Sequence, residues 1–383
     1  MILSDVCELI VDCPHSTAKD EGKGYPLIRT PNIGKGRLLL EGVHRVSQEV
    51  YDKRNFRAVP QKNDLIFARE APAGNVAIIK DETVCLGQRT VLIRPNVDVI
   101  NPDFLVYFLL SPKQQYALLG TANGATVAHV NIPTIRNLPI EIPDISIQNK
   151  IADILSNYDN LIENNQKQIK LLEEVAQRLY KEWFVDLHFP GYESVSITDG
   201  VPEGWSLEYI NDVADVQYGY AFDGSLFNDK GNGKPIIRIR NIPDGNTKDY
   251  TTEEANEQYI VKNGDIVVGM DGEFHINSWS GEDAYLVQRT CRIKPKNENM
   301  NGYLLYAIYE PIKFFEKTVV GATVAHLGKK HIDTIQIMTA PEKFYIPFQT
   351  LFNKRQVLLN QNKKLAEARD RLLPKLMSGE IEV

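Results

Sequence analysis

The sequence has few cysteines, and none of them stands in a metal-binding or redox spacing. Its four cysteines (Cys7, Cys13, Cys85 and Cys291) form no CxxC pair, and no pair of histidines lies near them at the spacing of metal ligands. We interpret them as reduced, mostly buried thiols of a cytoplasmic protein. We therefore predict neither disulfides nor a metal site.

Long apolar runs and a basic leader are also absent. No apolar run approaches the length that a membrane span requires, so we predict no contact with a membrane. The first residues, 1–8, carry acids and no basic region, unlike a signal peptide.

Positive charge is not in excess, since the formal net charge is −7. A protein that wraps DNA by itself is usually basic, because it must neutralise phosphates. The charge argues against a stand-alone DNA binder. It does not argue against one subunit of an assembly whose other subunits supply the basic surface.

The motifs of several enzyme classes are missing. The sequence has no Pro-Pro dipeptide, which the Asp/Asn-Pro-Pro-aromatic motif of adenine methyltransferases needs, no GxGxxG after a predicted strand and no P-loop. No nucleophile elbow supports Ser-His-Asp catalysis. Asp265, Asp271 and Glu273 lie close together, but the first half offers only Asp64 and Glu70 at matching places. We predict no catalytic residue and no nuclease-type metal site.

What the sequence does contain is an internal repeat of domain size. The string Gly-Ala-Thr-Val-Ala-His occurs at 124–129 and again at 321–326, and Gln-Arg-Thr occurs at 88–90 and at 288–290. The copies keep the same order at a spacing of roughly 200 residues, so the chain contains two copies of one unit. Two weaker matches support this, 26–33 with 235–242 and 63–66 with 264–267.

Each copy is predicted to be a mixed α/β head that is followed by a long helix. Short β-rich runs bounded by Gly, Pro and Asn, and then short helices behind prolines, occur in the same order in both copies. We predict an α/β (α+β) two-domain repeat with pseudo-twofold symmetry, whose heads are separated by two long helices packed as an antiparallel coiled coil. The predicted parts are a first head at 1–145, a helical region at 146–186, a second head at 187–345 and a helical region at 346–383.

The two helical regions carry heptad rows that neither helix is expected to bury in its own head. In the first, one row is apolar and the other contains a single polar residue, Asn165. In the second, the more polar row contains Asn362. In an antiparallel pair an a position faces a d position, and setting these two asparagines opposite each other overlaps the helices along their whole lengths. We predict that Asn165 and Asn362 fix the register, although each could instead point to solvent at the edge of the seam.

The polar residues of the repeated segments are candidates for DNA recognition. Arg can bind guanine bidentately, Asn and Gln can bind adenine, and Thr methyl groups can contact thymine. In the first head the candidates are Arg29, Asn32, Arg69, Gln88, Arg89, Asn123, Thr126, His129 and Asn131. In the second head they are Arg238, Arg240, Asn241, Asp271, Glu273, His275, Gln288, Arg289, Thr323, His326, Lys329 and Lys330.

The residues that both heads share have a second interpretation, in which they hold the fold together or grip phosphate, which carries no sequence information. Specificity should then lie where the heads differ. The differing segments are 68–75 against 269–278, 130–134 against 327–333, and 12–23 against 218–232.

An aromatic group, Tyr180, Trp183 and Phe184, ends the first helical region. It could dock a partner or pack beneath the second head, and we favour packing.

Several segments resemble type I restriction–modification specificity subunits, and the resemblance covers nearly the whole chain. The most specific are Arg178–Asp186 with His188–Gly191, Val201–Leu207 at the opening of the second head, and the terminal Arg369–Ile381. The joins between head and helix, 138–151 and 340–349, are also typical. The first head lacks a counterpart of Trp205 and has a short lead-in.

The resemblance implies a DNA reader without catalytic activity. Each head would read one half of a bipartite target in double-stranded DNA, and the helices would set the spacing between the halves. The implied partners are two methyltransferase subunits, which use S-adenosylmethionine to methylate adenine, and restriction/motor subunits that cleave with ATP and Mg. This chain itself would bind no cofactor.

Two other function classes stay open on the sequence alone. A cytoplasmic coiled-coil scaffold with two protein-binding heads would suit the negative net charge, and it predicts no DNA protection in any assembly. A duplicated enzyme is disfavoured by the mismatch of acidic residues between the heads.

Overall fold

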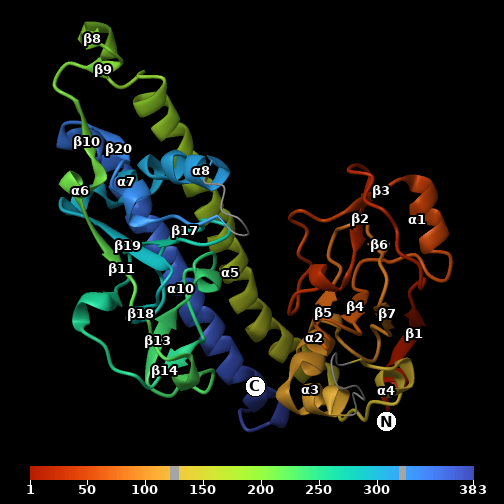
Figure 1. Cartoon of the computed structure of the whole chain (residues 1–383). Helices are drawn as coiled ribbons and strands as arrows, with labels where there is room; N and C mark the ends of the chain where they lie inside the picture. The colour runs from red at the N-terminus through yellow and green to blue at the C-terminus, as the bar shows by residue number, and fades with distance from the viewer. Residues whose placement is uncertain (121–128, 319–324) are drawn as a thin grey trace. The chain divides into compact units, whose positions relative to one another are not determined.

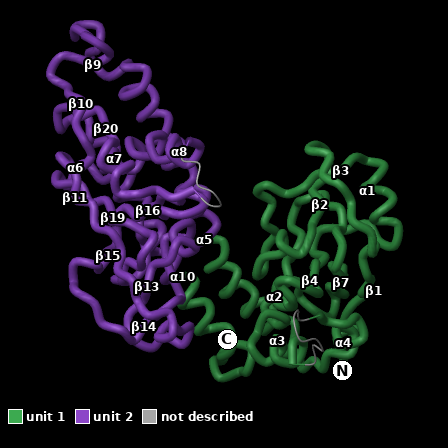
Figure 2. Tube along the Cα trace, viewed as in Figure 1, with its two compact units in different colours: residues 1–161, 365–383 green, residues 162–364 purple. Residues whose placement is uncertain are grey.

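The computed structural model describes residues 1–120, 129–318 and 325–383, and the chain divides into two compact units (Figure 2). Unit 1 comprises Met1–Leu161 and Leu365–Val383, and unit 2 comprises Ile162–Lys364. The sequence predicts boundaries at the ends of the long helices, whereas the compact units divide both helices. Each unit therefore contains one head together with a part of each helix.

Unit 1 contains two small sheets beside a group of short helices (Figure 1). The first sheet has the order β1-β7-β4-β5 with antiparallel neighbours, and the second has the order β3-β2-β6 with β2 parallel to β6. The strands are β1 Cys7–Asp12, β2 Tyr25–Ile28, β3 Arg45–Val46, β4 Leu65–Ala68, β5 Val76–Ile78, β6 Cys85–Leu86 and β7 Thr90–Pro95. The helices are α1 Gln48–Arg54, α2 Pro102–Leu110, α3 Pro112–Leu119 and α4 Ile132–Arg136.

Unit 2 repeats both sheet orders, which confirms the internal duplication. Its first sheet is β11-β19-β16-β17, and its second is β12-β14-β13-β18-β15, in which β13 is parallel to β18 as β2 is to β6. Two short pairs, β10-β20 and β8-β9, are added. The strands are β8 Ile197–Thr198, β9 Val201–Pro202, β10 Ser206–Tyr209, β11 Ala214–Tyr218, β12 Phe227–Asn228, β13 Lys234–Ile237, β14 Tyr250–Thr251, β15 Ile260–Val261, β16 Ile266–Gly269, β17 Ile276–Ser278, β18 Ala284–Leu286, β19 Thr290–Pro295 and β20 Gln336–Thr339. The helices are α6 Ile210–Val213, α7 Asn301–Ala307, α8 Tyr309–Thr318 and α9 Lys329–Ile332.

The weak repeat at 63–66 and 264–267 is a turn that starts the central strand of each first sheet. Asn63 has φ 70° and Gly264 has φ 91°, a left-handed conformation that Gly and Asn adopt more easily than other residues. The next residue, Asp64 or Asp265, is buried, and its carboxylate accepts the backbone N–H three positions earlier at 2.8 Å. This motif therefore has a structural role.

The two long helices are α5 (Ile145–Tyr180), which continues as the π-helical turn η3 (Lys181–Val185), and α10 (Ile346–Ser378). The polar contacts between the two helices show that they are antiparallel, because the residue numbers of the partners on α10 decrease as those on α5 increase. In unit 1 the pair is Asp159 with Arg369. In unit 2 the pairs are Asn165 with Asn362, at 2.9 Å, and Glu173 with Arg355, at 2.6 Å.

The expectation that neither helix buries its seam in its own head is wrong at the helix ends. Ile151 and Leu155 of α5 belong to the same buried cluster as the strands of the first head. Phe348 of α10 belongs to the buried cluster of the second head. The start of each helix therefore shares a core with the head that precedes it, because the apolar row continues past the coiled-coil contact. None of the described helices combines the length and the apolar character that a membrane span needs.

Candidate nucleic-acid interface

The repeated motifs meet in each head where the inner strands of the first sheet end, at a place that we call the shared edge. In the first head, Arg69 at the end of β4 donates its backbone N–H to the carbonyl of Arg89 at 3.0 Å, and it accepts from Val130 at 3.0 Å. In the second head, Met270 makes the same two bonds with Arg289, at 2.9 Å, and Leu327, at 2.8 Å. Three segments that are distant in sequence thus converge in the same way in both heads.

The Gln-Arg-Thr turn presents its arginine and buries its threonine. Arg89 and Arg289 have φ values of 65° and 70°, a left-handed backbone that costs a non-glycine residue about 1–2 kcal/mol. Thr90 and Thr290 are fully buried, and their hydroxyls bond backbone carbonyls of the turn. The arginine side chains are 55% and 56% exposed. The contacts of the threonines fit the scaffold interpretation, whereas the exposed arginines stay candidates for DNA recognition.

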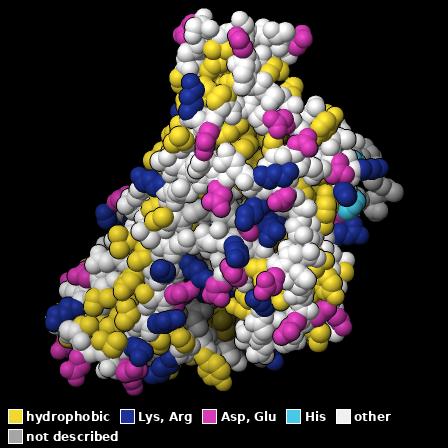
Figure 3. All heavy atoms as spheres, turned by 90° about the vertical axis from the view of Figure 1, so that its left-hand side faces the viewer, with side chains coloured by type: hydrophobic (Ala, Val, Ile, Leu, Met, Phe, Trp, Pro, Cys, Tyr) yellow, Lys and Arg dark blue, Asp and Glu magenta, His cyan; other side chains and the backbone are white. Residues whose placement is uncertain are grey.

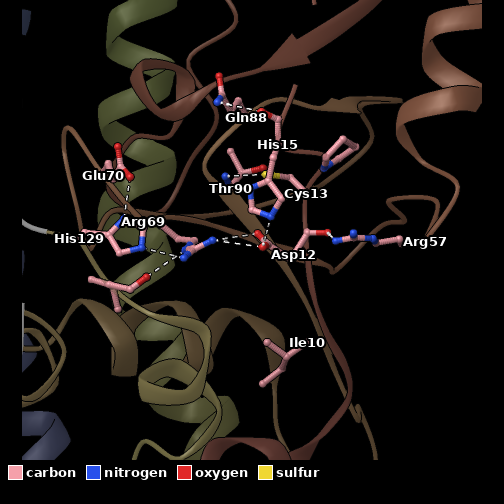
Figure 4. Close-up of polar contacts among 12 residues, drawn as sticks. Ile10, Asp12, Cys13, His15, Arg57, Arg69, Glu70, Gln88, Thr90 and His129 are labelled. Carbon is pink, nitrogen blue, oxygen red and sulfur yellow. Dashed lines mark hydrogen bonds and ion pairs between the residues drawn. The ribbon is translucent and has the colours of Figure 1, made fainter. Parts of the chain in front are cut away.

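A carboxylate, Glu70, links the arginine and the histidine of the shared edge in the first head, and Figure 4 shows its contact with His129. One oxygen of Glu70 lies 2.9 Å from Nη1 of Arg89, and the other lies 2.6 Å from Nδ1 of His129. On its far side, Nε2 of His129 lies 2.8 Å from Nη2 of Arg69. Because an arginine nitrogen only donates, Nε2 accepts this bond and Nδ1–H donates to Glu70. His129 therefore links Arg69 to Glu70 through its two ring nitrogens.

Arg69 is itself held inside the head and is 9% exposed. Its Nη1 lies 3.1 and 3.2 Å from the two carboxylate oxygens of Asp12, and its Nε donates to the carbonyl of Val130 at 3.0 Å. The same carboxylate lies 3.1 Å from Nε2 of His15. Asp12 and His15 were not among the sequence candidates, and the difference between the segments 12–23 and 218–232 was the only signal for them.

The second head builds the same three-residue cluster with fewer partners. Nδ1 of His326 lies 2.5 Å from a carboxylate oxygen of Asp271, which is the counterpart of Glu70. Nη1 of Arg289 lies 3.4 Å from that oxygen and 3.2 Å from Nδ1 of His326. Met270 stands where the first head has Arg69, so the side of the histidine away from the carboxylate has no arginine against it. We call Glu70–Arg89–His129 and Asp271–Arg289–His326 the shared clusters.

Two of the candidate asparagines serve the fold instead of an open surface. Asn32 accepts the N–H of Arg29 and donates to the carbonyl of Leu39, and Asn241 accepts the N–H of Arg238 at 2.8 Å. Their amide groups are thus taken by a tight turn, because the side chain of an Asn three residues on can cap the preceding backbone N–H. We therefore assign Asn32 and Asn241 to the fold and not to DNA contact.

The arginines beside Asn241 have partners within the head. Arg238 lies over the ring of Phe227, and Arg240 pairs with Asp249, whose carboxylate also accepts from Asn241. Partial burial alone would raise the pKa of Asp249, but the hydrogen bonds from Arg240 and Asn241 outweigh it and lower the pKa. Arg240 keeps an exposed side chain, so it stays a candidate.

Gln88 and Gln288 differ although both belong to the repeat. The amide of Gln88 donates to the carbonyl of His15 at 3.0 Å and accepts the Thr17 hydroxyl at 2.9 Å, which ties the segment 12–23 to the shared edge. Gln288 is exposed.

The other candidates are spread around the edge. Asn131, Glu273, Lys329 and Lys330 are exposed, and His275 is half-buried with its Nδ1 at 3.7 Å from Glu273. Asn123, Thr126 and Thr323 lie outside the described residues, and so does most of each Gly-Ala-Thr-Val-Ala-His string. Within 1–120, 129–318 and 325–383, no three His, Cys, Asp or Glu side chains gather as ligands of a metal ion.

The aromatic group at the end of α5 packs into the core of the second head. Phe184 is buried against Trp205 and Tyr303, with ring centroids 5.0 and 4.5 Å away. Tyr180 stacks on Phe184, and Trp183 meets Phe348 edge-on. This packing supports the core interpretation over partner docking, because Phe184 is buried and the other two rings pack on aromatic residues. The sequence could not separate the two, since both need aromatic residues at the end of a helix.

Charges of both signs are interspersed over the face of the molecule in Figure 3. This face shows no continuous basic surface of the kind with which a single protein binds DNA, which agrees with the formal net charge of −7.

Comparison with known proteins gives the family. The family described as "Type I restriction modification DNA specificity domain" matches residues 1–174 and 202–343, which is more than half of the chain. The specificity subunit of the type I restriction enzyme MjaIX from Methanocaldococcus jannaschii is 26% identical over 367 residues, covering 90% of this chain and 83% of that protein. The specificity subunit of the enzyme HindI from Haemophilus influenzae is 21% identical over 402 residues, covering 84% and 87%.

One solved structure shares the fold. The S subunit of a type I restriction-modification system from M. genitalium superimposes with a TM-score of 0.55 over 98% of this chain and 95% of that one, at 15% identity.

Proposed function

We propose, since this chain belongs to the family of type I restriction modification DNA specificity proteins, that each of its heads reads one half of a bipartite target in double-stranded DNA. The observation that carries the proposal is the shared cluster. In both heads an exposed arginine pairs with a carboxylate that also contacts a histidine. A guanidinium with several unused N–H groups suits phosphate oxygens and the acceptor edge of guanine.

The chain acts as a recognition subunit without chemistry of its own. In the proposed assembly the pair α5–α10 sets the distance between half-sites and docks two methyltransferase subunits, which bind S-adenosylmethionine. Restriction/motor subunits that use ATP and Mg join this complex in the cytoplasm. The charge of −7 fits such a division, because the partner subunits would supply much of the phosphate contact.

The first experiment is methylome sequencing of a host that expresses the chain together with its modification subunit. We expect a new bipartite N6-methyladenine motif that disappears when the chain is omitted. In a second arm, residues 1–145 are exchanged for the first head of a relative, and only one half of the motif should change. The reciprocal exchange of residues 187–345 is the control, and it should change the other half.

Two results would count against the proposal. An assembled complex that adds no methylation motif would favour the scaffold with two protein-binding heads. A motif that survives exchange of the first head would remove the model of two independent readers.

A further inference from the structure

The two heads differ directly after the histidine of the shared cluster. Three residues after it, each head begins a short helix, α4 in the first head and α9 in the second. Helix α4 starts with Ile132-Pro133-Thr134, and α9 starts with Lys329-Lys330-His331. Lys329 and Lys330 are both exposed. Two cations thus stand in the second head at places where the first head has none.

In the first head, the cationic side chains near the shared edge have partners within the head. Arg69 faces Asp12, and Arg89 faces Glu70, so two positive charges meet two negative ones beside His129. The cation at the end of α4, Arg136, donates to the carbonyl of Ile10 in β1 at 2.6 Å. Each of these three arginines therefore has a partner within the head, two of them carboxylates.

The second head adds exposed cations beside the carboxylate of its shared cluster. Asp271 alone serves Arg289 and His326, because Met270 replaces the buried arginine. Within the described parts of the chain, neither Lys329 nor Lys330 forms an ion pair. Counting Asp271, Glu273, Arg289, Lys329 and Lys330 leaves an excess of one positive charge at this edge.

The neighbouring His331 responds to this field. Burial lowers the pKa of His331, and the positive groups Lys330 and His326 lower it further. Its Nδ1 accepts the backbone N–H of Gly328 at 3.0 Å, so His331 adds structure to the start of α9 without adding a charge there.

We propose that Arg289, Lys329 and Lys330 form a cationic clamp on DNA phosphates that belongs to the second head alone. This inference rests on the proposed function and adds that the two heads grip DNA unequally. Lysine binds phosphate as a point charge with little demand on geometry, so the clamp contributes affinity and not sequence choice. The second half-site is held by salt-sensitive contacts, and the first is held mainly by hydrogen bonds and shape.

The test compares two double variants of the full chain in complex with its methyltransferase subunits. K329Q/K330Q removes two charges from the clamp. K262Q/K294Q removes two exposed charges from the end of β16 and β19 that lies away from the shared edge of the same head. Fluorescence anisotropy with a DNA duplex that carries the target is measured across a series of salt concentrations. A third variant, K329R/K330R, keeps the charges.

We expect the slope of log affinity against log salt to fall by about 0.9 for each phosphate that is no longer neutralised, or about 1.8 for K329Q/K330Q. The control pair and the arginine variant should keep the original slope, and the methylated motif should stay the same. An unchanged slope in K329Q/K330Q, or an equal fall in K262Q/K294Q, would overturn the clamp. Failure of the unaltered complex to prefer its target would instead count against the proposed function.

Discussion

At the scale of single residues, the most constrained position of the shared edge is the arginine. Arg89 and Arg289 both hold a left-handed backbone, which glycine adopts at no steric cost and which other residues enter at a penalty. Functional positions tolerate such strain when the surrounding structure over-determines it. The backbone bonds of Arg69 and Met270 to these two carbonyls supply that constraint. The repeated strain points to a side chain that matters more than local stability.

Substitution of Arg289 should separate stability from binding. The free energy of unfolding of Arg289→Gly should exceed that of Arg289→Ala by about 1 kcal/mol, because alanine keeps the cost of the left-handed backbone and glycine does not. Both variants should bind target DNA roughly tenfold or more weakly, which corresponds to removing a charged hydrogen bond of about 1.5–3 kcal/mol. Urea unfolding and anisotropy measure the two effects. Equal stability of the two variants would contradict the strain argument.

The buried thiols give a pH-dependent prediction. Burial raises the pKa of Cys291 from its ordinary value of 9.0 to about 12 and that of Cys85 to about 11. The unfolded chain therefore loses these protons first. Stability should fall as the pH rises from 9 towards 11, by at most about 1.4 kcal/mol per pH unit for each thiol. Urea unfolding at pH 8 to 10.5 should show a shallower fall for Cys291→Ala than for the unaltered chain, and an identical slope would refute it.

Residue roles were only partly predictable from the sequence. The repeat located the arginine and histidine of each shared cluster, because identical strings in two copies identify what both copies need. It could not assign Asn32 and Asn241 to a turn, since a capping Asn and a base-reading Asn look the same in a sequence. The sequence suggests Glu70 only as a metal ligand, and Asp271 as a metal ligand or a DNA contact. Their contacts with arginine and histidine required the fold.

At the scale of elements, the polar contacts between α5 and α10 are the informative feature. The heptad alignment predicts that Asn165 and Asn362 face each other, and the structure brings their amides to 2.9 Å. Asn165 is buried, so an apolar partner opposite it would leave amide hydrogen bonds unmade. The proposed role of the pair is to exclude other registers, as a buried asparagine does in coiled coils.

This role predicts a reciprocal pattern of stability. Asn362→Leu alone should lower the free energy of unfolding by about 1–3 kcal/mol, because the buried amide of Asn165 loses its partner. Asn165→Leu should lower it less, because the amide of Asn362 is only half-buried. The double variant should recover most of that decrease and could exceed the unaltered chain. Its methylation motif should then show more than one spacing between half-sites. Additive decreases in the double-mutant cycle would argue that the two side chains act independently.

Elements with strong local patterns were predicted well, and those without were missed. The runs near 64–68, 76–79, 90–94, 265–269 and 290–294 became β4, β5, β7, β16 and β19. The sequence does not predict β1 and β11, whose burial alternates weakly along the strand. These strands lie at one edge of their sheets and depend on pairing with β7 and β19, which are distant in sequence. Such pairing leaves little local signal.

At the scale of the whole molecule, the compact units divide the long helices, whereas the predicted boundaries lay at the helix ends. Periodicity marks where a helix begins and ends but not which core its apolar face joins. Ile151 and Leu155 illustrate this, because they satisfy the heptad rule and are also part of the core of the first head. Exchange of heads at residue 145 therefore places a new partner against α5, and heads with similar residues at this contact should be chosen.

The likeness of the two shared clusters has a consequence for the spelling of the target. If identical groups in the two heads selected the bases, they would favour the same bases in both half-sites, and the two half-sites would have the same sequence. Two half-sites of different sequence require that the bases be selected by residues that only one of the two heads contains. The segments 12–23 and 218–232, and the ends of β4 and β16, are where such groups stand. Substitutions that change which bases are recognised should therefore map to these segments, while the shared clusters can stay constant.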